Sequence, residues 1–159
     1  MIGFQSAPII IGSEAMHIPE GERAAPELSH SWRVYVKIQP SVVKSVQFRL
    51  HESFANPLVT ISEPPFEIRQ FGWGEFSIQI RIVLFNDERI MTNHYLVLHG
   101  ASYPVISERM DSVVYKGKAV PVDPKYTFEY EGEEDEYRRI DSAINHLLDQ
   151  YEHVKNEQM

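Results

Sequence analysis

Two short segments hold the residues whose types and spacing could do chemistry in this chain. The first, His51-Glu52-Ser53-Phe54, combines an imidazole, a hydroxyl and an aromatic ring. The second, Gly72-Trp73-Gly74, places an indole between two glycines, whose backbone tolerates angles and close approaches that other residues resist. Residues of these types could form a nucleophile pair, a metal site or a binding pocket.

A catalytic or metal site is the less favoured interpretation. His51 and Ser53 are two residues apart, so on an extended strand their side chains project side by side rather than toward each other. The chain has no G-x-S-x-G elbow, and His51, His94 and His99 lack the spacing of a metal-binding motif. It also has no cysteine, which excludes thiolate zinc sites. We therefore expect no enzyme activity, no metal and no cofactor.

A binding pocket uses these residue types better. Two aromatic planes, one hydroxyl and one backbone N–H suit a flat, neutral ligand that carries an amide, such as an acylated lysine. The amide would stack between Phe54 and Trp73, which adds about 0.5–1.5 kcal/mol beyond buried area. It would also bond to Ser53 and to the Trp73 N–H, at about 1 kcal/mol each. The alternative is that the Gly-Trp-Gly segment is only a tight turn with its indole at the core edge.

Alternating apolar residues predict the strands that position these segments. Trp32 to Ile38 keeps its apolar side chains on one face, which turns Tyr35 away from the core. Val42 to His51 does the same and leaves His51 off the core face, while Phe76 to Phe85 carries the strongest alternation and predicts a central strand. Short strands with turn signals between them predict an all-β antiparallel β-sandwich. Tyr95 to Leu98, closed by Gly100, is predicted as another strand. Further strand candidates are Pro8 to Gly12 (as an edge strand), Leu58 to Ile61, Ser112 to Tyr115 and Tyr126 to Tyr130.

The C-terminal segment differs in kind from the rest. From residue 129 onward ten acidic residues stand against three basic ones, which accounts for most of the net charge of −8. Apolar residues from Tyr137 to Val154 recur at spacings of three and four, which predicts an amphipathic α-helix with a narrow seam. We predict a sandwich domain over 1–130 and an acidic segment with this helix over 131–159. The helix either docks on its own sandwich or, as the narrow seam favours, pairs with another chain.

Composition excludes several classes of function. At 159 residues, with 43% apolar and 24% charged residues, the chain is of ordinary globular type. The sequence shows no basic stripe of the kind that nucleic-acid-binding proteins carry, so we expect no direct binding of nucleic acid. No apolar run is long enough to span a bilayer, and the first residues lack the features of a signal peptide. The acidic tail suits a basic partner, or simply solubility.

Motifs along the chain resemble the YEATS domain family. His30 to Val36, HSWRVYV, is similar to the opening motif of that family. Others follow in the family's order, so that the resemblance spans about residues 8–115: Val46 to Pro57, Pro64 to Ile68, Gly72 to Phe76, and His94 to Leu98. Pro8 to Gly12 and the C-terminal helix resemble the subgroup found in chromatin-remodelling and histone-acetyltransferase complexes.

The resemblance implies a nuclear, immunoglobulin-like sandwich that reads acetylated or crotonylated lysine in histone H3 tails. Phe54 and Trp73 would then hold the acyl amide, which would bond to the Ser53 hydroxyl and the Trp73 N–H. His51 would line the pocket and hold Ser53. The remaining implied pocket residues are Gly72, and Tyr35 and Gly74 at the edge. The alternative is a scaffold subunit that acts through its C-terminal helix and leaves the pocket unused.

Overall fold

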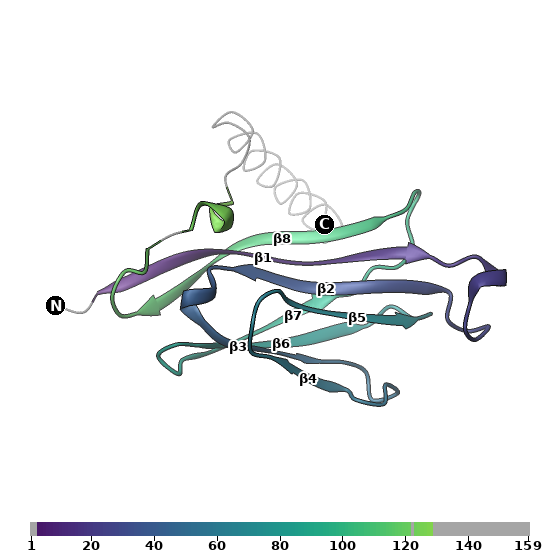
Figure 1. Ribbon diagram of the computed structural model, residues 1–159, viewed down its shortest axis with the longest axis horizontal. Helices are drawn as coiled ribbons and strands as arrows, with labels where there is room; N and C mark the ends of the chain where they lie inside the picture. Colours follow the sequence, from purple (N-terminus) through teal and green to yellow (C-terminus); the bar gives the residue numbers. More distant parts are fainter. Residues whose placement is uncertain (1–2, 122, 129–159) are drawn as a thin grey trace, which may run out of the picture. The chain divides into compact units, whose positions relative to one another are not determined.

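Eight β-strands form two antiparallel sheets in the computed structural model, which describes residues 3–121 and 123–128 (Figure 1). The first, the β1 sheet, has the order β5-β2-β1-β8, with β5 at Phe66–Gly72, β2 at His30–Ile38, β1 at Phe4–His17 and β8 at Val105–Lys116. The second, the β3 sheet, has the order β4-β3-β6-β7, with β4 at Leu58–Ile61, β3 at Val43–Arg49, β6 at Ser77–Leu84 and β7 at Arg89–Tyr95. Short 3-10 turns occupy Glu20–Glu22, Pro40–Val42 and Pro124–Tyr126.

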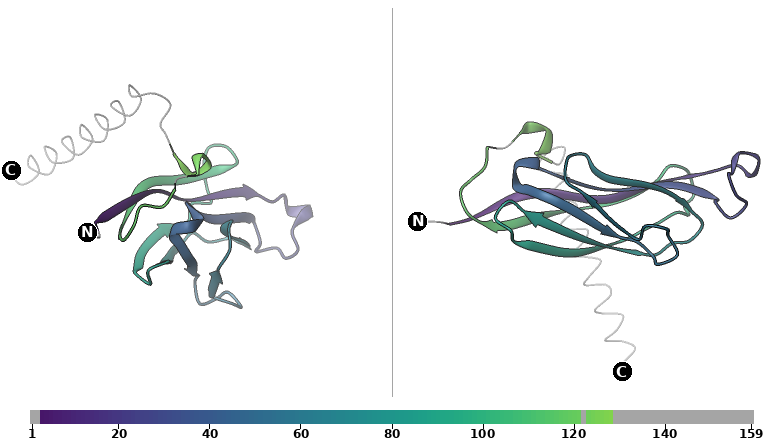
Figure 2. Two further views of the ribbon diagram at one scale, coloured as in Figure 1. Left: turned by 60° about the vertical axis from the view of Figure 1, so that its left-hand side comes forward. Right: turned by 60° about the horizontal axis from the view of Figure 1, so that its bottom comes forward.

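The two sheets face each other across a hydrophobic core (Figure 2). Period-2 alternation is the reason, since it turns every second side chain of a strand to the same face. Val34 from the β1 sheet and Phe48 and Ile80 from the β3 sheet are all fully buried. The predicted all-β antiparallel sandwich is therefore confirmed, as are the strands expected at Trp32 to Ile38, Leu58 to Ile61 and Phe76 to Phe85. Among the described residues, no helix is long and apolar enough to cross a membrane.

The expected edge strand at Pro8 to Gly12 is wrong. It is part of β1, which pairs with β2 on one side and with β8 on the other. Proline is tolerated because pairing with β2 begins only at Ile9, so Pro8 lies where β1 has β8 as its one neighbour.

Two other expected strands differ from the structure. Of Tyr95 to Leu98, only Tyr95 belongs to a strand. The Leu96 N–H still donates to the Phe76 carbonyl, but the Leu98 N–H donates to the Glu75 carboxylate instead of to a neighbouring strand. Tyr126 ends a 3-10 turn in which the Asp123 side chain accepts a hydrogen bond from the Lys125 N–H, so it does not begin a strand, and the last two residues of that expected strand lie outside the described residues.

The chain divides into two units, Met1–Thr127 and Phe128–Met159, and the sandwich belongs to the first. The predicted helix from Tyr137 to Val154 lies outside the described residues. The predicted segment boundary at 130 and 131 also lies there, and both stay predictions.

Strand pairing brings the two chemically notable segments to the same end of the sandwich. The first follows β3 and the second precedes β6, and these strands pair antiparallel up to Arg49 and Gln79. A hydrogen bond of 2.6 Å from the Leu50 N–H to the Pro57 carbonyl closes the first loop. On the β1 sheet, His30 pairs with Gly72, which brings the chain before β2 to the same end.

Candidate functional site

A cavity of about 470 Å³, here called the loop cavity, opens where these three loops meet. Six of the seven residues expected at the site line it: His51, Ser53, Phe54, Gly72, Trp73 and Gly74. The other lining residues are Glu27, Leu28, Ala55, Phe71, Glu75 and Phe76. The lining is therefore aromatic and apolar, with a few polar groups.

His51 and Ser53 interact directly, which side-by-side projection from a straight strand would not produce. The Ser53 backbone N–H points to His51 Nδ1 at 3.2 Å, and Ser53 Oγ lies 2.8 Å from the same nitrogen. A backbone N–H can only donate, so Nδ1 is the acceptor and the neutral imidazole carries its proton on Nε2. The hydroxyl hydrogen of Ser53 therefore also points to His51. The Oγ lone pairs are left for an external donor.

Phe54 turns into the cavity because the chain bends directly after β3. Its N–H donates to the His51 carbonyl at 3.1 Å, which forms the bend that strand parity alone does not provide. Its ring packs 5.6 Å from the Phe76 ring and edge-on against Trp32, with centroids 6.1 Å apart. Trp73 differs, since 67% of it is exposed. One aromatic wall of the cavity is thus held by the core and the other stands free.

The two glycines beside Trp73 act differently from what the sequence suggested. Among the described glycines, positive φ occurs at Gly117, so neither Gly72 nor Gly74 adopts a backbone conformation reserved for glycine. At Gly72 a Cβ would lie 3.4 Å from Trp32 Nε1, a buried N–H without a hydrogen-bond partner among the described residues. At Gly74 it would meet nothing within 4 Å. The role of both glycines is therefore to leave space beside Trp73, and not to allow a strained backbone conformation.

Glu75 holds the loop that carries Trp73. Its Oε2 accepts hydrogen bonds from the backbone N–H groups of Leu98, at 2.7 Å, and His99, at 3.3 Å. These bonds stabilise the ionised carboxylate, and the Leu98 bond is the main cause that lowers the pKa of Glu75 below its usual value. On the other side of the loop, Ser29 Oγ donates to the Gly72 carbonyl at 3.4 Å.

Several lining residues were missed by sequence reasoning. Phe76 starts the alternation of β6 and was assigned to the core, although its ring also packs against His51 at 6.3 Å. Glu27 and Leu28 belong to a polar loop without any motif. Only the pairing of His30 with Gly72 brings them to the cavity, and no local signal in the sequence reports that pairing.

Tyr35 is the one residue expected at the site that does not line the loop cavity. It lies on the outer face of the β1 sheet and does not line the loop cavity, because its partners across the sheet, Gly12 and Glu67, are far from the Gly72 end. It is only 3% exposed, and its hydroxyl donates to the Glu108 carboxylate. Burial and then this carboxylate raise the pKa of Tyr35. Arg33 lies over its ring at 4.5 Å.

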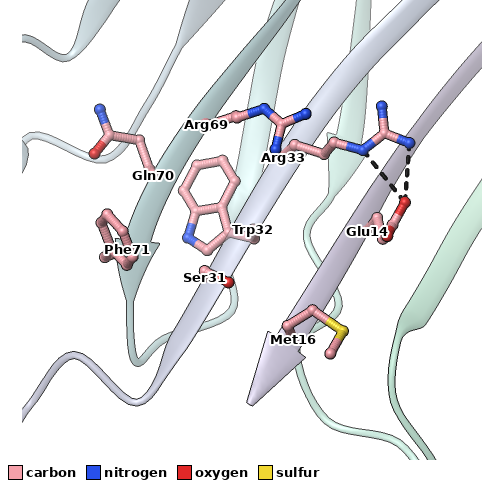
Figure 3. Close-up of a pocket in the computed structure, with 8 residues that line it drawn as sticks. All are labelled: Glu14, Met16, Ser31, Trp32, Arg33, Arg69, Gln70 and Phe71. Atoms are coloured by element: carbon pink, nitrogen blue, oxygen red, sulfur yellow. Dashed lines mark hydrogen bonds and ion pairs between the residues drawn. The ribbon is translucent and has the colours of Figure 1, made fainter. Parts of the chain in front are cut away.

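A second hollow of about 520 Å³, the outer groove, crosses the same outer face (Figure 3). Arg33 bonds there to Glu14 through Nε and Nη2, at 3.2 and 2.9 Å, and through Nη1 to Glu67 at 2.9 Å. The charges of the groove thus largely satisfy one another. Phe71 lines both hollows.

The histidines considered as metal ligands do not converge. His94 is buried and shares a 2.8 Å hydrogen bond with Ser13, whereas His99 packs edge-on against His30, with centroids 4.9 Å apart. In the part of the chain that the structure describes, no three His, Cys, Asp or Glu side chains are placed to hold a metal ion.

Comparisons with known proteins agree on one family. The YEATS family model matches residues 27–100, which contain every residue that lines the loop cavity. The Protein AF-9 homolog of Schizosaccharomyces pombe is 29% identical over 96% of this chain and 88% of its own length. Transcription initiation factor TFIID subunit 14b of Arabidopsis thaliana is 35% identical over 69% of this chain, but the match covers only 46% of that protein.

Solved structures of YEATS domains share the fold of this chain. The Yaf9 YEATS domain bound to H3K27ac superposes with a TM-score of 0.68 at 31% identity, over 74% of this chain and 89% of that one. The same domain in complex with an H3K122suc peptide gives a TM-score of 0.65 at 31% identity, over 73% of this chain and 88% of that one. In fold, sequence and the residues matched, the chain belongs to the YEATS family.

Proposed function

We propose that this chain is a non-catalytic reader that binds acylated lysine of histone H3 in the loop cavity, as a nuclear subunit of a complex that acts on chromatin or transcription. One observation carries the proposal. The Ser53 hydroxyl, oriented by His51, opens into a cavity whose walls include Phe54, held by the core, and the free indole of Trp73.

The hydrogen bonds of Ser53 determine what it can recognise. Since its hydrogen is directed to His51 Nδ1, its oxygen accepts, and the amide N–H of an acyl-lysine is a suitable donor. The carbonyl of the same amide would accept from the Trp73 N–H, one residue beyond the end of β5. The planar amide would then lie along the two aromatic walls, and the volume of about 470 Å³ leaves room for acyl groups longer than acetyl.

Unmodified lysine would bind more weakly for a specific reason. The aromatic rings alone could attract its ammonium. An ammonium, however, has no acceptor for the Trp73 N–H, and a donor left unpaired on binding costs about 1–3 kcal/mol. The hydroxyl and the backbone N–H, rather than the rings, would therefore reject the unmodified side chain.

The relatives support the ligand and the setting. The Yaf9 YEATS domain, 31% identical, has been solved with acylated H3 peptides, and the TFIID subunit of Arabidopsis belongs to a transcription factor. We extend the histone ligand, the chromatin setting and the nuclear location to this chain by inference.

Titration of fluorescent H3 peptides tests the proposal. Acetylated and crotonylated peptides are expected to bind in the micromolar range, and the unmodified peptide at least about tenfold more weakly, given the unpaired donor. Equal, millimolar binding of all three would contradict the proposal and favour a scaffold role.

We propose a second contact through the predicted helix at Tyr137 to Val154, with a partner subunit or a second copy. Sedimentation of the full chain and of a chain ending at residue 132 tests for a second copy. Identical monomer masses would exclude self-association through this segment.

A further inference from the structure

A buried histidine beside the Trp73 loop is hydrogen-bonded through both of its ring nitrogens. His30 is only 2% exposed and lies at the start of β2, where it pairs with Gly72. Its Nδ1 lies 2.8 Å from Ser29 Oγ, and its Nε2 lies 3.1 Å from the hydroxyl oxygen of Tyr103. Ser29 Oγ in turn donates to the Gly72 carbonyl at 3.4 Å. One line of hydrogen bonds, here called the His30 relay, therefore runs from the Tyr103 hydroxyl through His30 to the Gly72 carbonyl.

The last bond of the His30 relay determines the direction of all the others. A carbonyl can only accept, so the single hydroxyl hydrogen of Ser29 is used on Gly72. Ser29 Oγ must then accept from Nδ1 of His30, which therefore carries the ring proton. Burial is the main cause that lowers the pKa of His30, so the ring is neutral at pH 7. Its Nε2 is then an acceptor, and the Tyr103 hydroxyl donates to it.

The Gly72 carbonyl belongs to the same peptide unit as the Trp73 N–H. This unit is planar, with its oxygen and hydrogen pointing in opposite directions, so a bond that holds the oxygen also orients the N–H. Trp73 follows the last residue of β5, and among the described residues its N–H donates to no loop carbonyl. The bond from Ser29 is long at 3.4 Å, and a ligand bonded to the N–H would strengthen it, because hydrogen bonds on the two sides of a peptide unit polarise each other.

The three side chains of the His30 relay lie outside the loop cavity. They can act on a ligand only through the peptide unit before Trp73. The ring of His30 is held from two further sides, because His17 and His99 pack edge-on against it, with centroids 5.4 and 4.9 Å away. Tyr103 is 38% exposed, so the relay connects the protein surface to the backbone of the loop.

We propose that the His30 relay orients the peptide unit before Trp73, so that its three side chains are positioning residues for the N–H that receives the acyl carbonyl. The ligand part of this inference rests on the proposed function. Tyr103 selects the tautomer of His30. Without the Tyr103 hydroxyl, the ring proton can equally lie on Nε2. Ser29 then turns its hydrogen to Nδ1, and the Gly72 carbonyl loses this donor.

Nitrogen-15 NMR of the free protein tests the relay itself. The ring signals of His30 should show the proton on Nδ1 in the unchanged chain and a population with the proton on Nε2 in Tyr103→Phe. The amide signal of Trp73 should shift in the same variant, although the deleted hydroxyl belongs to the other end of the relay. Tyr126→Phe is the matched control, since Tyr126 ends the 3-10 turn whose capping residue bonds to Gln39, beyond the far end of β2.

Titration with an acetylated H3 peptide tests what the relay does for binding. Ser29→Ala and Tyr103→Phe should each weaken binding by about threefold, less than the loss of a full hydrogen bond, because the Trp73 N–H itself remains. The double variant should bind no more weakly than Ser29→Ala, since Tyr103 acts through Ser29. Ser29→Thr keeps a hydroxyl at this position and should restore the affinity. Thermal unfolding of each variant gives a temperature at which all of them are folded, and the titrations are made there.

The outcomes distinguish the relay from the proposed function. If the His30 tautomer and the Trp73 amide respond as expected but no acylated peptide binds, the proposed function fails and the hold of the relay on the peptide unit stands. If His30 carries its proton on Nε2 in the unchanged chain, or if Tyr103→Phe leaves the Trp73 amide unmoved, the relay is wrong. If the acetylated peptide binds and both single variants match the unchanged chain, or their effects add in full, the positioning role is wrong.

Discussion

Nδ1 of His51 accepts two hydrogen bonds from Ser53, one from its backbone N–H at 3.2 Å and one from its hydroxyl at 2.8 Å. The first determines the tautomer of the ring, and the tautomer determines the direction of the hydroxyl. Neither residue acts alone, because His51 supplies the orientation and Ser53 the contact to the ligand.

Ser53→Ala should weaken binding of an acetylated H3 peptide by about fivefold, the value of one net hydrogen bond. His51→Ala should weaken it by a similar factor, since it frees the hydroxyl to rotate. The double variant should lose little more than either single one, because the two side chains act as one unit. Full additivity in calorimetric titrations would contradict this coupling. Ser62→Ala, in the exposed turn after β4, is the matched control.

Trp73→Ala should abolish measurable binding and leave the protein as stable as before. The side chain is 67% exposed, so it contributes little to the core, and exposed substitutions usually change stability by less than about 0.5 kcal/mol. Phe4→Ala is the matched control, because Phe4 is 76% exposed and lies at the end of β1 opposite to the loop cavity. Thermal unfolding and peptide titration of both variants check this, and normal binding by Trp73→Ala would place the pocket elsewhere.

Gly74→Ala should fold normally but bind more weakly. Its new methyl group would meet no protein atom within 4 Å, yet the residue lines the loop cavity, so the methyl group occupies space proposed for the ligand. Unchanged stability together with unchanged affinity would show that the ligand does not reach this side of the cavity. Gly21→Ala, in a loop with equally open space, is the control.

Strand alternation predicted those parts of the fold that depend on a single strand. The burial of Val34 and Phe48 and the exposure of His51 follow from parity and are confirmed. Parity does not reveal how strands pair. For this reason the sequence predicts an edge strand at Pro8 to Gly12, whereas β1 forms two ladders.

The same distinction applies to the candidate site. Residues in recognisable motifs, such as Ser53 and Trp73, were named from the sequence, and the structure brings them to one cavity. Glu27 reaches it only through the pairing of two strands distant in sequence. Tyr35 does not line this cavity, because a motif position does not tell which strand end a side chain is near, and its hydrogen-bond partner, Glu108, lies 73 residues further along the chain.

Gly12→Ala should destabilise the fold by about 1–3 kcal/mol, the usual cost of overpacking. A Cβ at Gly12 would lie 2.6 Å from Glu108 Cβ and 2.8 Å from the Tyr35 hydroxyl oxygen, so the two bonded side chains would have to separate. Chemical unfolding should show the loss. Peptide affinity of the folded fraction should stay unchanged, because Tyr35 lies away from the loop cavity, and a large fall in affinity would return Tyr35 to the site.

Acid should destabilise the sandwich through two buried histidines. Burial is the main cause that lowers the pKa of both His30 and His94. The positive charges of His99, His17 and Arg23 lower the pKa of His30 further, whereas Glu75 raises it. Arg109 lowers the pKa of His94 further. The unfolded chain takes up these protons near pH 6.5 and the folded chain only at lower pH. The unfolded state therefore binds more protons below about pH 6.5, and the free energy of unfolding falls there and not above. Urea unfolding between pH 7.5 and 5.5 should show that fall with a smaller slope in His94→Asn, and an equal slope in that variant would mean that His94 binds its proton equally in the folded and unfolded states.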